Sequence, residues 1–270
     1  MLKEDVDSEA LVLAEESSTK VIPLIAMAGN RSREVLINPT ARKAAVENIS
    51  RVVRDNSFDG VNIDLEIIRS EGMDYTDYKE GFIAFLYELR EELPQNKRLD
   101  VCVLPPVKPP SHLAQIYDLK EIFKVADRVV MMAYDYSHSG TEPGPVAPLW
   151  WVEENIEYML KMGLPPEKLS LGIATYGYDW LLGGRGATAR GNVEIKRIVE
   201  QYRAQVNWDQ ENQVPVIDYS DPEVGEREIW FENNASIKKK LELVNKYGLA
   251  GCSFWRLGFE EQGLWDQVEK

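Results

Sequence analysis

Residues 58–66 read Phe-Asp-Gly-Val-Asn-Ile-Asp-Leu-Glu, and apolar and polar side chains alternate from Val61 to Glu66. Alternate residues of a β-strand point to the same face. The three apolar side chains are therefore expected on one face, and Asn62, Asp64 and Glu66 on the other. This pattern predicts a strand that packs on one side and presents three polar groups on the other side.

Apolar runs rich in β-branched residues recur along the chain, with amphipathic segments between them. The predicted strands are residues 21–27, 60–65, 99–104, 128–133, 169–175 and 251–255. This alternation is typical of parallel strands with helical crossovers, and it predicts an α/β fold of the (β/α)8 TIM barrel type. Six strands are two fewer than an eight-stranded barrel requires. Because residues 9–17 have a helical pattern, we expect that the chain lacks the first one or two strands.

The helix boundaries and the long segment after the fifth predicted strand complete this outline. Asn38 before Pro39 predicts a helix start, and Gly248 after Tyr247 predicts a helix end. The segment 181–247 is longer than a crossover needs, and PVIDYS (215–220) and REIWFEN (227–233) predict two short strands within it. We expect one catalytic domain over residues 1–270, with 181–247 as an inserted α+β subdomain at the barrel mouth.

The polar face of residues 60–66 is a candidate catalytic site. Barrel enzymes keep their sites at the carboxyl ends of the strands, where Glu66 would lie. Two nearby carboxyl groups repel when both are ionised, which raises the proton affinity of one and suits it to general acid catalysis. The alternative is a structural hydrogen-bond network, but burying three polar groups without a function is costly.

Charge and hydropathy exclude several classes of partner. The chain has 31 Lys and Arg against 45 Asp and Glu, a formal net charge of -14, so we expect neither nucleic acid nor an anionic membrane surface as a partner. No apolar stretch approaches the length of a membrane span, and residues 1–10 lack the profile of a secretory signal peptide. Cys102 and Cys252 lie in apolar runs and are predicted to be free thiols.

A cofactor is not expected. His112 and His138 are the only histidines, and neither has a carboxylate at metal-binding spacing, which argues against a histidine-based zinc site. An alternative remains in which Asp64, Glu66 and Asp135 hold magnesium as oxygen ligands. That enzyme would lose activity with a chelator, whereas a metal-free hydrolase would not.

Several motifs together resemble one known family. Asp59 to Glu66 is similar to the DGxDxDxE signature of glycoside hydrolase family 18, the chitinase-like family, with Asn62 in place of the first aspartate of the DxDxE core. Met132 to Asp135 resembles the MxYD motif of the sixth strand, Gly172 to Trp180 resembles the seventh-strand segment, and Trp255 matches the eighth-strand tryptophan. The amino-acid sequences of these motifs are most similar to those of the bacterial branch of spore-cortex-lytic and spore-germination glucosaminidases.

The resemblance implies substrate-assisted, retaining catalysis, in which the 2-acetamido group of the substrate attacks the anomeric carbon. Glu66 would protonate the glycosidic oxygen and later activate water. Asp64 would orient the acetamido group and stabilise its developing positive charge. Tyr134 would donate a hydrogen bond to the acetamido carbonyl.

The resemblance also implies a set of substrate-binding residues. Asn62 would hold Asp64 by a neutral hydrogen bond, and Asp135 would contact the sugar. Trp255 would lie under the N-acetyl sugar, because the C–H face of a sugar stacks on an aromatic ring. Tyr136 and Tyr176, just beyond their strands, are further candidates for the cleft.

The expected substrate is an N-acetylated glycan, either peptidoglycan or a chitin oligosaccharide, and the expected location is extracellular, cell-wall or spore-associated. The pattern does not distinguish these two substrates, nor exo from endo cleavage. A different class of function stays open: a catalytically weak or inactive barrel that binds carbohydrate. Retention of Asp64 and Glu66 favours the enzyme.

Overall fold

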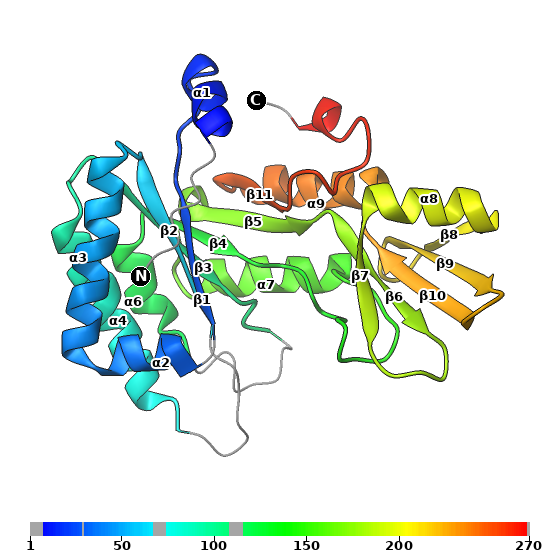
Figure 1. The fold of residues 1–270 in the computed structure, drawn as a ribbon, viewed down its shortest axis with the longest axis horizontal. Coiled ribbons are helices and arrows are strands. Elements are labelled where there is room, and N and C mark those ends of the chain that lie inside the picture. Colours follow the sequence, from blue (N-terminus) through cyan, green and yellow to red (C-terminus); the bar gives the residue numbers. More distant parts are fainter. Residues whose placement is uncertain (1–7, 29, 67–73, 108–115, 269–270) are drawn as a thin grey trace. The chain divides into compact units, whose positions relative to one another are not determined.

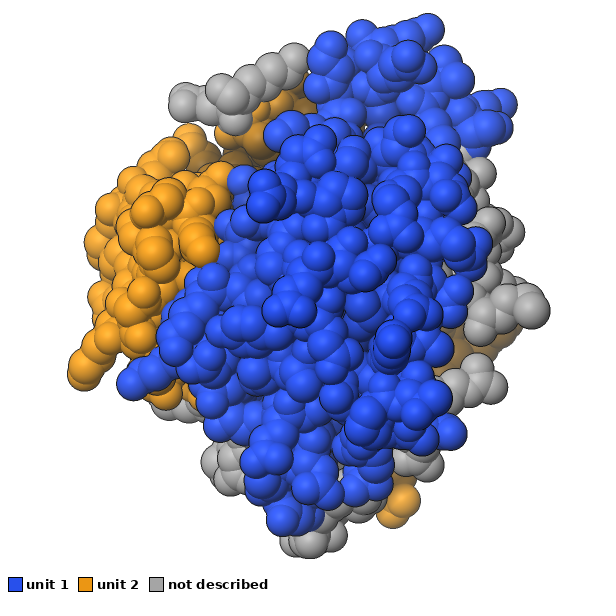
Figure 2. Space-filling view, turned by 90° about the vertical axis from the view of Figure 1, so that its left-hand side faces the viewer, with its two compact units in different colours: residues 1–103, 115–129 blue, residues 104–114, 130–270 orange. Residues whose placement is uncertain are grey.

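The computed structural model describes residues 8–28, 30–66, 74–107 and 116–268. The chain divides into two compact units, which Figure 2 distinguishes by colour. Unit 1 comprises residues 1–103 and 115–129, and unit 2 comprises residues 104–114 and 130–270. Each unit is described by itself.

Unit 1 contains three parallel strands: β1 (Leu24–Ala28), β2 (Gly60–Glu66) and β3 (Arg98–Val103). β2 pairs with β1 from Asn62 to Glu66, with Ala28 opposite Glu66, and with β3 from Gly60 to Ile63. Gly60 is required at the start of β2, because a Cβ there would collide with the backbone of Arg98 on β3. The register therefore carries Glu66 to the carboxyl end of β2, beside the end of β1.

The helices of unit 1 are α1 (Ser8–Glu16), α2 (Asn30–Ile37), α3 (Pro39–Asp55), α4 (Thr76–Glu92) and α6 (Leu119–Val125). α3 begins where the sequence predicts, because the Asn38 side chain accepts hydrogen bonds from the amides of Thr40 and Ala41. α3 and α4 contact each other (Figure 1). Each buries apolar side chains that recur at helical spacing.

Unit 2 contains two parallel strands, β5 (Leu169–Ala174) and β11 (Gly251–Trp255), which pair with Trp255 opposite Ala174. The helices α7 (Leu149–Lys161) and α9 (Asn234–Tyr247) contact each other, and α9 also contacts β5 and β11. α9 begins with a capping box at Asn233 and ends at Gly248, whose φ of 60° lies in the left-handed region. The predicted helix end at Gly248 is thus confirmed.

The rest of unit 2 is an antiparallel sheet in the order β7-β6-β10-β9-β8. Its strands are β6 (Tyr176–Leu181), β7 (Ala187–Gly191), β8 (Val206–Asp209), β9 (Val214–Asp221) and β10 (Gly225–Phe231). The helix α8 (Asn192–Tyr202) contacts this sheet (Figure 1). It buries Ile195 against Ile217 and Ile229. β9 and β10 confirm the two predicted short strands, although the sheet already starts at Tyr176, ahead of residue 181.

All six predicted parallel strands are present as strands, with β4 (Arg128–Met131) as the fourth. Among the described residues no strand precedes β1, and α1 covers most of the segment 9–17 that was expected to be helical. In the described ranges, no helix is both long enough and apolar enough to cross a membrane. The α/β class and the helical first segment were thus predicted correctly.

Two strands are each shorter than predicted by two residues. β1 begins at Leu24 and not at residue 21, because Pro23 has no N–H to donate to a ladder. β4 ends at Met131, since the amides of Ala133 and Tyr134 donate to the carbonyls of Met131 and Met132 in tight turns. Residues 132–135 therefore form a loop directly after β4.

Candidate active site

The polar face of β2 is present as predicted. Val61, Ile63 and Leu65 are at most 2% exposed, whereas Asn62 and Asp64 are half-buried and Glu66 is exposed. The three polar residues alternate with the three buried ones, so they share the other face of the strand. Glu66 is the last residue of β2, at the edge of the sheet where its carboxyl group can reach a ligand.

Asp64 carries a carboxylate oxygen that is deeply buried. Its Oδ1 has no hydrogen-bond partner among the described residues. Burial disfavours the charged form and raises the pKa of this carboxyl group above its ordinary value of 3.8. A desolvated carboxylate with a free oxygen is suited to accept a hydrogen bond from a ligand or to stabilise a positive charge that forms beside it.

Asn62 is linked to the neighbouring strand. The Cys102 thiol on β3 lies 3.4 Å from Asn62 Oδ1 and donates to it. Burial, together with the nearby Asp64, raises the pKa of Cys102 to about 12, so the thiol keeps its proton and acts as a donor. Cys102 and Cys252 are both free thiols, as predicted.

Two tyrosines of unit 1 lie near the carboxylates and were not predicted as site residues. The Tyr78 hydroxyl, from α4, donates to the carbonyl of Leu65 at 3.1 Å. The Tyr117 hydroxyl is buried and has no hydrogen-bond partner among the described residues. Burial is the largest cause that raises the pKa of Tyr78 and of Tyr117, and the charges of Glu66 and Asp64 raise both further. Both phenols therefore stay protonated beside the polar face of β2.

Unit 2 contains a second cluster, built around Asp135. This residue follows β4 with a φ of 61°, in the left-handed region that aspartate adopts more readily than most residues. Its carboxylate accepts hydrogen bonds from the hydroxyls of Tyr176 at 2.5 Å and Tyr178 at 3.0 Å. The residue as a whole is exposed, but desolvation of its carboxyl group raises the pKa of Asp135, and the two hydroxyls oppose that rise.

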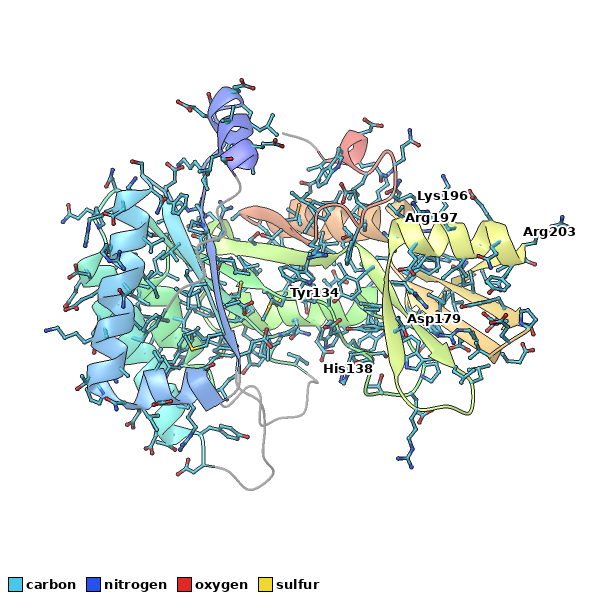
Figure 3. The ribbon with its side chains drawn as sticks, viewed as in Figure 1. Tyr134, His138, Asp179, Lys196, Arg197 and Arg203 are labelled. Atoms are coloured by element: carbon cyan, nitrogen blue, oxygen red, sulfur yellow. The ribbon has the colours of Figure 1, made fainter. Side chains whose placement is uncertain are left out.

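Tyr176 and Tyr178 share a face because they are two residues apart on β6. The ring of Tyr176 contacts that of Tyr134 edge to face, with centroids 6.3 Å apart. Tyr134, labelled in Figure 3, is half-buried. The resemblance gave Tyr176 as a candidate, but Tyr178 was missed although it occupies the same face of the predicted segment.

The remaining predicted residues of unit 2 are aromatic. Tyr136 is half-buried and packs edge to face against Trp150 and Trp151, at 5.7 Å and 5.3 Å between ring centroids. Trp255 is the last residue of β11 and is 46% exposed, a high value for a tryptophan. The Thr175 amide donates to the Trp255 carbonyl at 2.9 Å. The indole of Trp255 therefore presents an accessible apolar surface, and a hydrogen bond fixes the backbone that carries it.

A third carboxylate has a purely structural environment. Asp179 on β6, labelled in Figure 3, is fully buried and pairs with Arg190 at 3.2 Å and Arg227 at 2.8 Å. The Tyr219 hydroxyl also donates to it, at 3.1 Å. The charge of Asp179 is thus compensated by its arginine partners, as expected for a carboxylate that stabilises the sheet. Asp64 has no such partner among the described residues.

The predicted site residues form two groups. Asn62, Asp64 and Glu66 lie together on β2 in unit 1, and Tyr134, Asp135, Tyr136, Tyr176 and Trp255 belong to unit 2. In the part of the chain that the structure describes, no cluster of three His, Cys, Asp or Glu residues could hold a metal ion. His112 lies outside the described residues.

Parallel strands that alternate with helices, and acidic groups at the end of one strand, define the class of α/β enzymes that keep their sites at the carboxyl edge of the sheet. The chain belongs to glycosyl hydrolases family 18, whose model matches residues 8–260. The resemblance of the motifs is thereby confirmed.

Individual relatives agree with this assignment. The chain is 32% identical to a Bacillus subtilis protein named as a sporulation-specific glycosylase, YdhD, over 83% of this chain and 53% of that protein. It is 29% identical to the cortical fragment-lytic enzyme of Bacillus subtilis, over 94% of this chain and 60% of that enzyme. The chain therefore spans about half to three fifths of these relatives. The crystal structure of a chitinase from Chromobacterium violaceum superposes with a TM-score of 0.84 at 25% identity, over 99% of this chain and 85% of that one.

Proposed function

We propose that this chain is a glycosidase that cleaves glycans containing β-linked N-acetylglucosamine, with Glu66 as the proton donor. The observation that carries the proposal is the polar face of β2. Glu66 is exposed at the end of the strand, and Asp64, two residues before it on the same face, has a buried and unpartnered oxygen. Such a pair provides one carboxyl group for proton transfer and one for charge stabilisation.

In the proposed reaction the acetamido group of the substrate is the nucleophile. Glu66 protonates the glycosidic oxygen as the bond breaks, and it then removes a proton from the water that opens the oxazolinium intermediate. Asp64 holds the acetamido N–H and stabilises the positive charge of the intermediate. The buried position of Asp64 strengthens this interaction, because charges interact more strongly where water is excluded.

The second group of residues is proposed to bind the sugar. Asp135 is exposed, and two tyrosine hydroxyls orient its carboxylate, which is proposed to accept a further hydrogen bond from a sugar hydroxyl. The exposed indole of Trp255 offers a surface for the C–H face of the sugar. Tyr134 is proposed to donate to the acetamido carbonyl, with Tyr136 and Asn62 in supporting positions.

Peptidoglycan and chitin oligosaccharides are the proposed substrates, and a spore or cell-wall location is proposed with them. Similarity to a cortical fragment-lytic enzyme supports the first substrate, and similarity to a chitinase structure supports the second. Both polymers contain β-linked N-acetylglucosamine, so the proposed chemistry is the same for both.

The test is incubation of the wild type and Glu66→Gln with N-acetylglucosamine oligomers and with cortex peptidoglycan, followed by mass analysis of the products. We expect shortened glycans from the wild type and none from Glu66→Gln. Glu47→Gln is the matched control, because Glu47 lies on α3 with a side chain 60% exposed. Binding of both glycans without any product from the wild type would favour a carbohydrate-binding protein.

A further inference from the structure

The Ser32 hydroxyl connects the carboxyl ends of β1 and β2. Ser32 lies on α2 and is fully buried. Its Oγ is 3.0 Å from the carbonyl oxygen of Met27 on β1 and 2.9 Å from the carbonyl oxygen of Glu66 on β2. A serine hydroxyl has a single hydrogen, so it is shared between these two acceptors and ties both strand ends to one helix.

The end of β2 depends on this contact. β3 pairs with β2 from Gly60 to Ile63, so among the described residues of unit 1 only β1 continues the ladder along Leu65 and Glu66. The Tyr78 hydroxyl holds the carbonyl of Leu65, and the Ser32 hydroxyl holds the carbonyl of Glu66. Each of the last two backbone carbonyls of β2 thus accepts a hydrogen bond from a helix side chain.

The helix that carries Ser32 is itself held in place. Leu36 of α2 is fully buried, and its carbonyl accepts a hydrogen bond from Arg42 at 2.8 Å. Gly81 of α4 lies against the same carbonyl, so closely that an added Cβ would collide with it. A hydroxyl on a packed helix fixes the position of its partner better than one on a loop.

We infer that Ser32 is a positioning residue, which sets the direction of the Glu66 carboxyl group by holding the Glu66 backbone. This inference rests on the proposed function of Glu66. Without the Ser32 hydroxyl, Glu66 keeps its carboxyl group but loses one of the hydrogen bonds that fix its backbone. Proton donation depends on geometry, and a displacement of about 1 Å in a catalytic group can cost about a hundredfold in rate.

The test uses Ser32→Ala with Ser50→Ala as matched control. Ser50 is also fully buried, and its hydroxyl also donates to a glutamate carbonyl, that of Glu92 at 3.0 Å, but it lies on α3. Rates are measured on an N-acetylglucosamine oligomer and on a 4-nitrophenyl glycoside, whose leaving group needs little protonation. We expect Ser32→Ala to lower kcat on the oligomer between about tenfold and a hundredfold, with KM within about twofold and a smaller loss on the aryl glycoside. Ser50→Ala should keep wild-type rates on both.

A double variant tests whether Ser32 acts through Glu66. In the Glu66→Gln background Ser32→Ala should cause no further loss, because there is no acid left to position. Ser32→Cys is the second variant if Ser32→Ala does not fold, since a thiol is a similar but weaker donor, and it should show the same bias against the oligomer.

The inference is overturned if the wild type is active and Glu66→Gln is not, while Ser32→Ala matches the wild type. It is also overturned if Ser32→Ala loses the same factor on both substrates, or if Ser50→Ala loses as much. A wild-type rate in Glu66→Gln, or no turnover by the wild type, would instead overturn the proposed function and this inference with it.

Discussion

At the scale of single residues, three carboxylates have different environments. Asp179 is paired with two arginines, Asp135 accepts two tyrosine hydroxyls, and Asp64 has an oxygen with no partner among the described residues. Both oxygens of the structural carboxylate, Asp179, are thus satisfied, whereas Oδ1 of Asp64 is not. An unpartnered buried oxygen is costly unless a ligand satisfies it, which is why Asp64 is the stronger candidate for function.

We predict that Asp64→Asn lowers turnover and changes the pH dependence. Burial raises the pKa of Asp64 above 3.8, and the reaction needs the ionised form, so wild-type activity should fall as the pH drops through that raised pKa. Asparagine cannot titrate, so this acid limb of kcat/KM should be lost together with most of the rate. Asp55→Asn is the control, because the Asp55 side chain is 64% exposed on α3. An unchanged profile in Asp64→Asn would contradict the assigned role.

We predict that Tyr178→Phe raises the pKa of Asp135. The Tyr178 hydroxyl stabilises the Asp135 carboxylate at 3.0 Å and opposes the effect of desolvation, so its removal should raise the Asp135 pKa, which an NMR titration of the Asp135 carboxyl carbon measures. Tyr219→Phe is the matched control, since it removes a hydroxyl from Asp179 instead. A shift of equal size in both variants would show that the effect is general and not specific to Asp135.

At the scale of elements, a buried ion pair connects the end of the antiparallel sheet to α9. Lys240 Nζ lies 2.8 Å from Glu232 Oε2, and both side chains are at most 1% exposed. The Ser236 hydroxyl also donates to Glu232, at 2.6 Å. Such a pair is stable only when both partners are present, because a single buried charge is uncompensated.

We predict that Lys240→Met lowers the free energy of unfolding by about 3–5 kcal/mol, since it leaves Glu232 buried without its cation. Urea unfolding measures this change. Lys239→Met is the control, because Lys239 is 44% exposed and lies 3.6 Å from Glu242, and we expect a change within about 0.5 kcal/mol there. Unfolding of both variants at the same urea concentration would contradict a stabilising role of the Lys240–Glu232 pair.

The elements also indicate what the sequence can predict. The faces of β2 followed from alternation alone, and the start of α3 followed from Asn38 ahead of Pro39. The contacts of Ser32 and Tyr78 did not, because periodicity assigns a side chain to a buried face and does not say which distant backbone carbonyl its hydroxyl reaches. These partners come from the packing of α2 and α4, which the local sequence pattern does not predict.

At the scale of the whole molecule, the order of strands and helices was predictable and the sheet boundary in unit 2 was less so. The strand β6 begins at Tyr176, one residue after β5 ends, and nearly all residues of both strands are buried. A continuous buried run has no periodicity that marks where one sheet ends and another begins. The cluster around Asp135 depends on this break, because it places Tyr176 and Tyr178 on the face that meets the carboxylate.

The central claim is that Glu66 donates a proton to the leaving group, and the most direct measurement is the rate of Glu66→Gln on an unactivated N-acetylglucosamine oligomer. Glutamine keeps the shape of the side chain and removes the acidic proton. We predict that kcat falls by a factor of about a hundred to ten thousand, the usual cost of losing a positioned general acid, with an unchanged melting temperature. A rate near that of the wild type, from a folded Glu66→Gln protein, would contradict the claim.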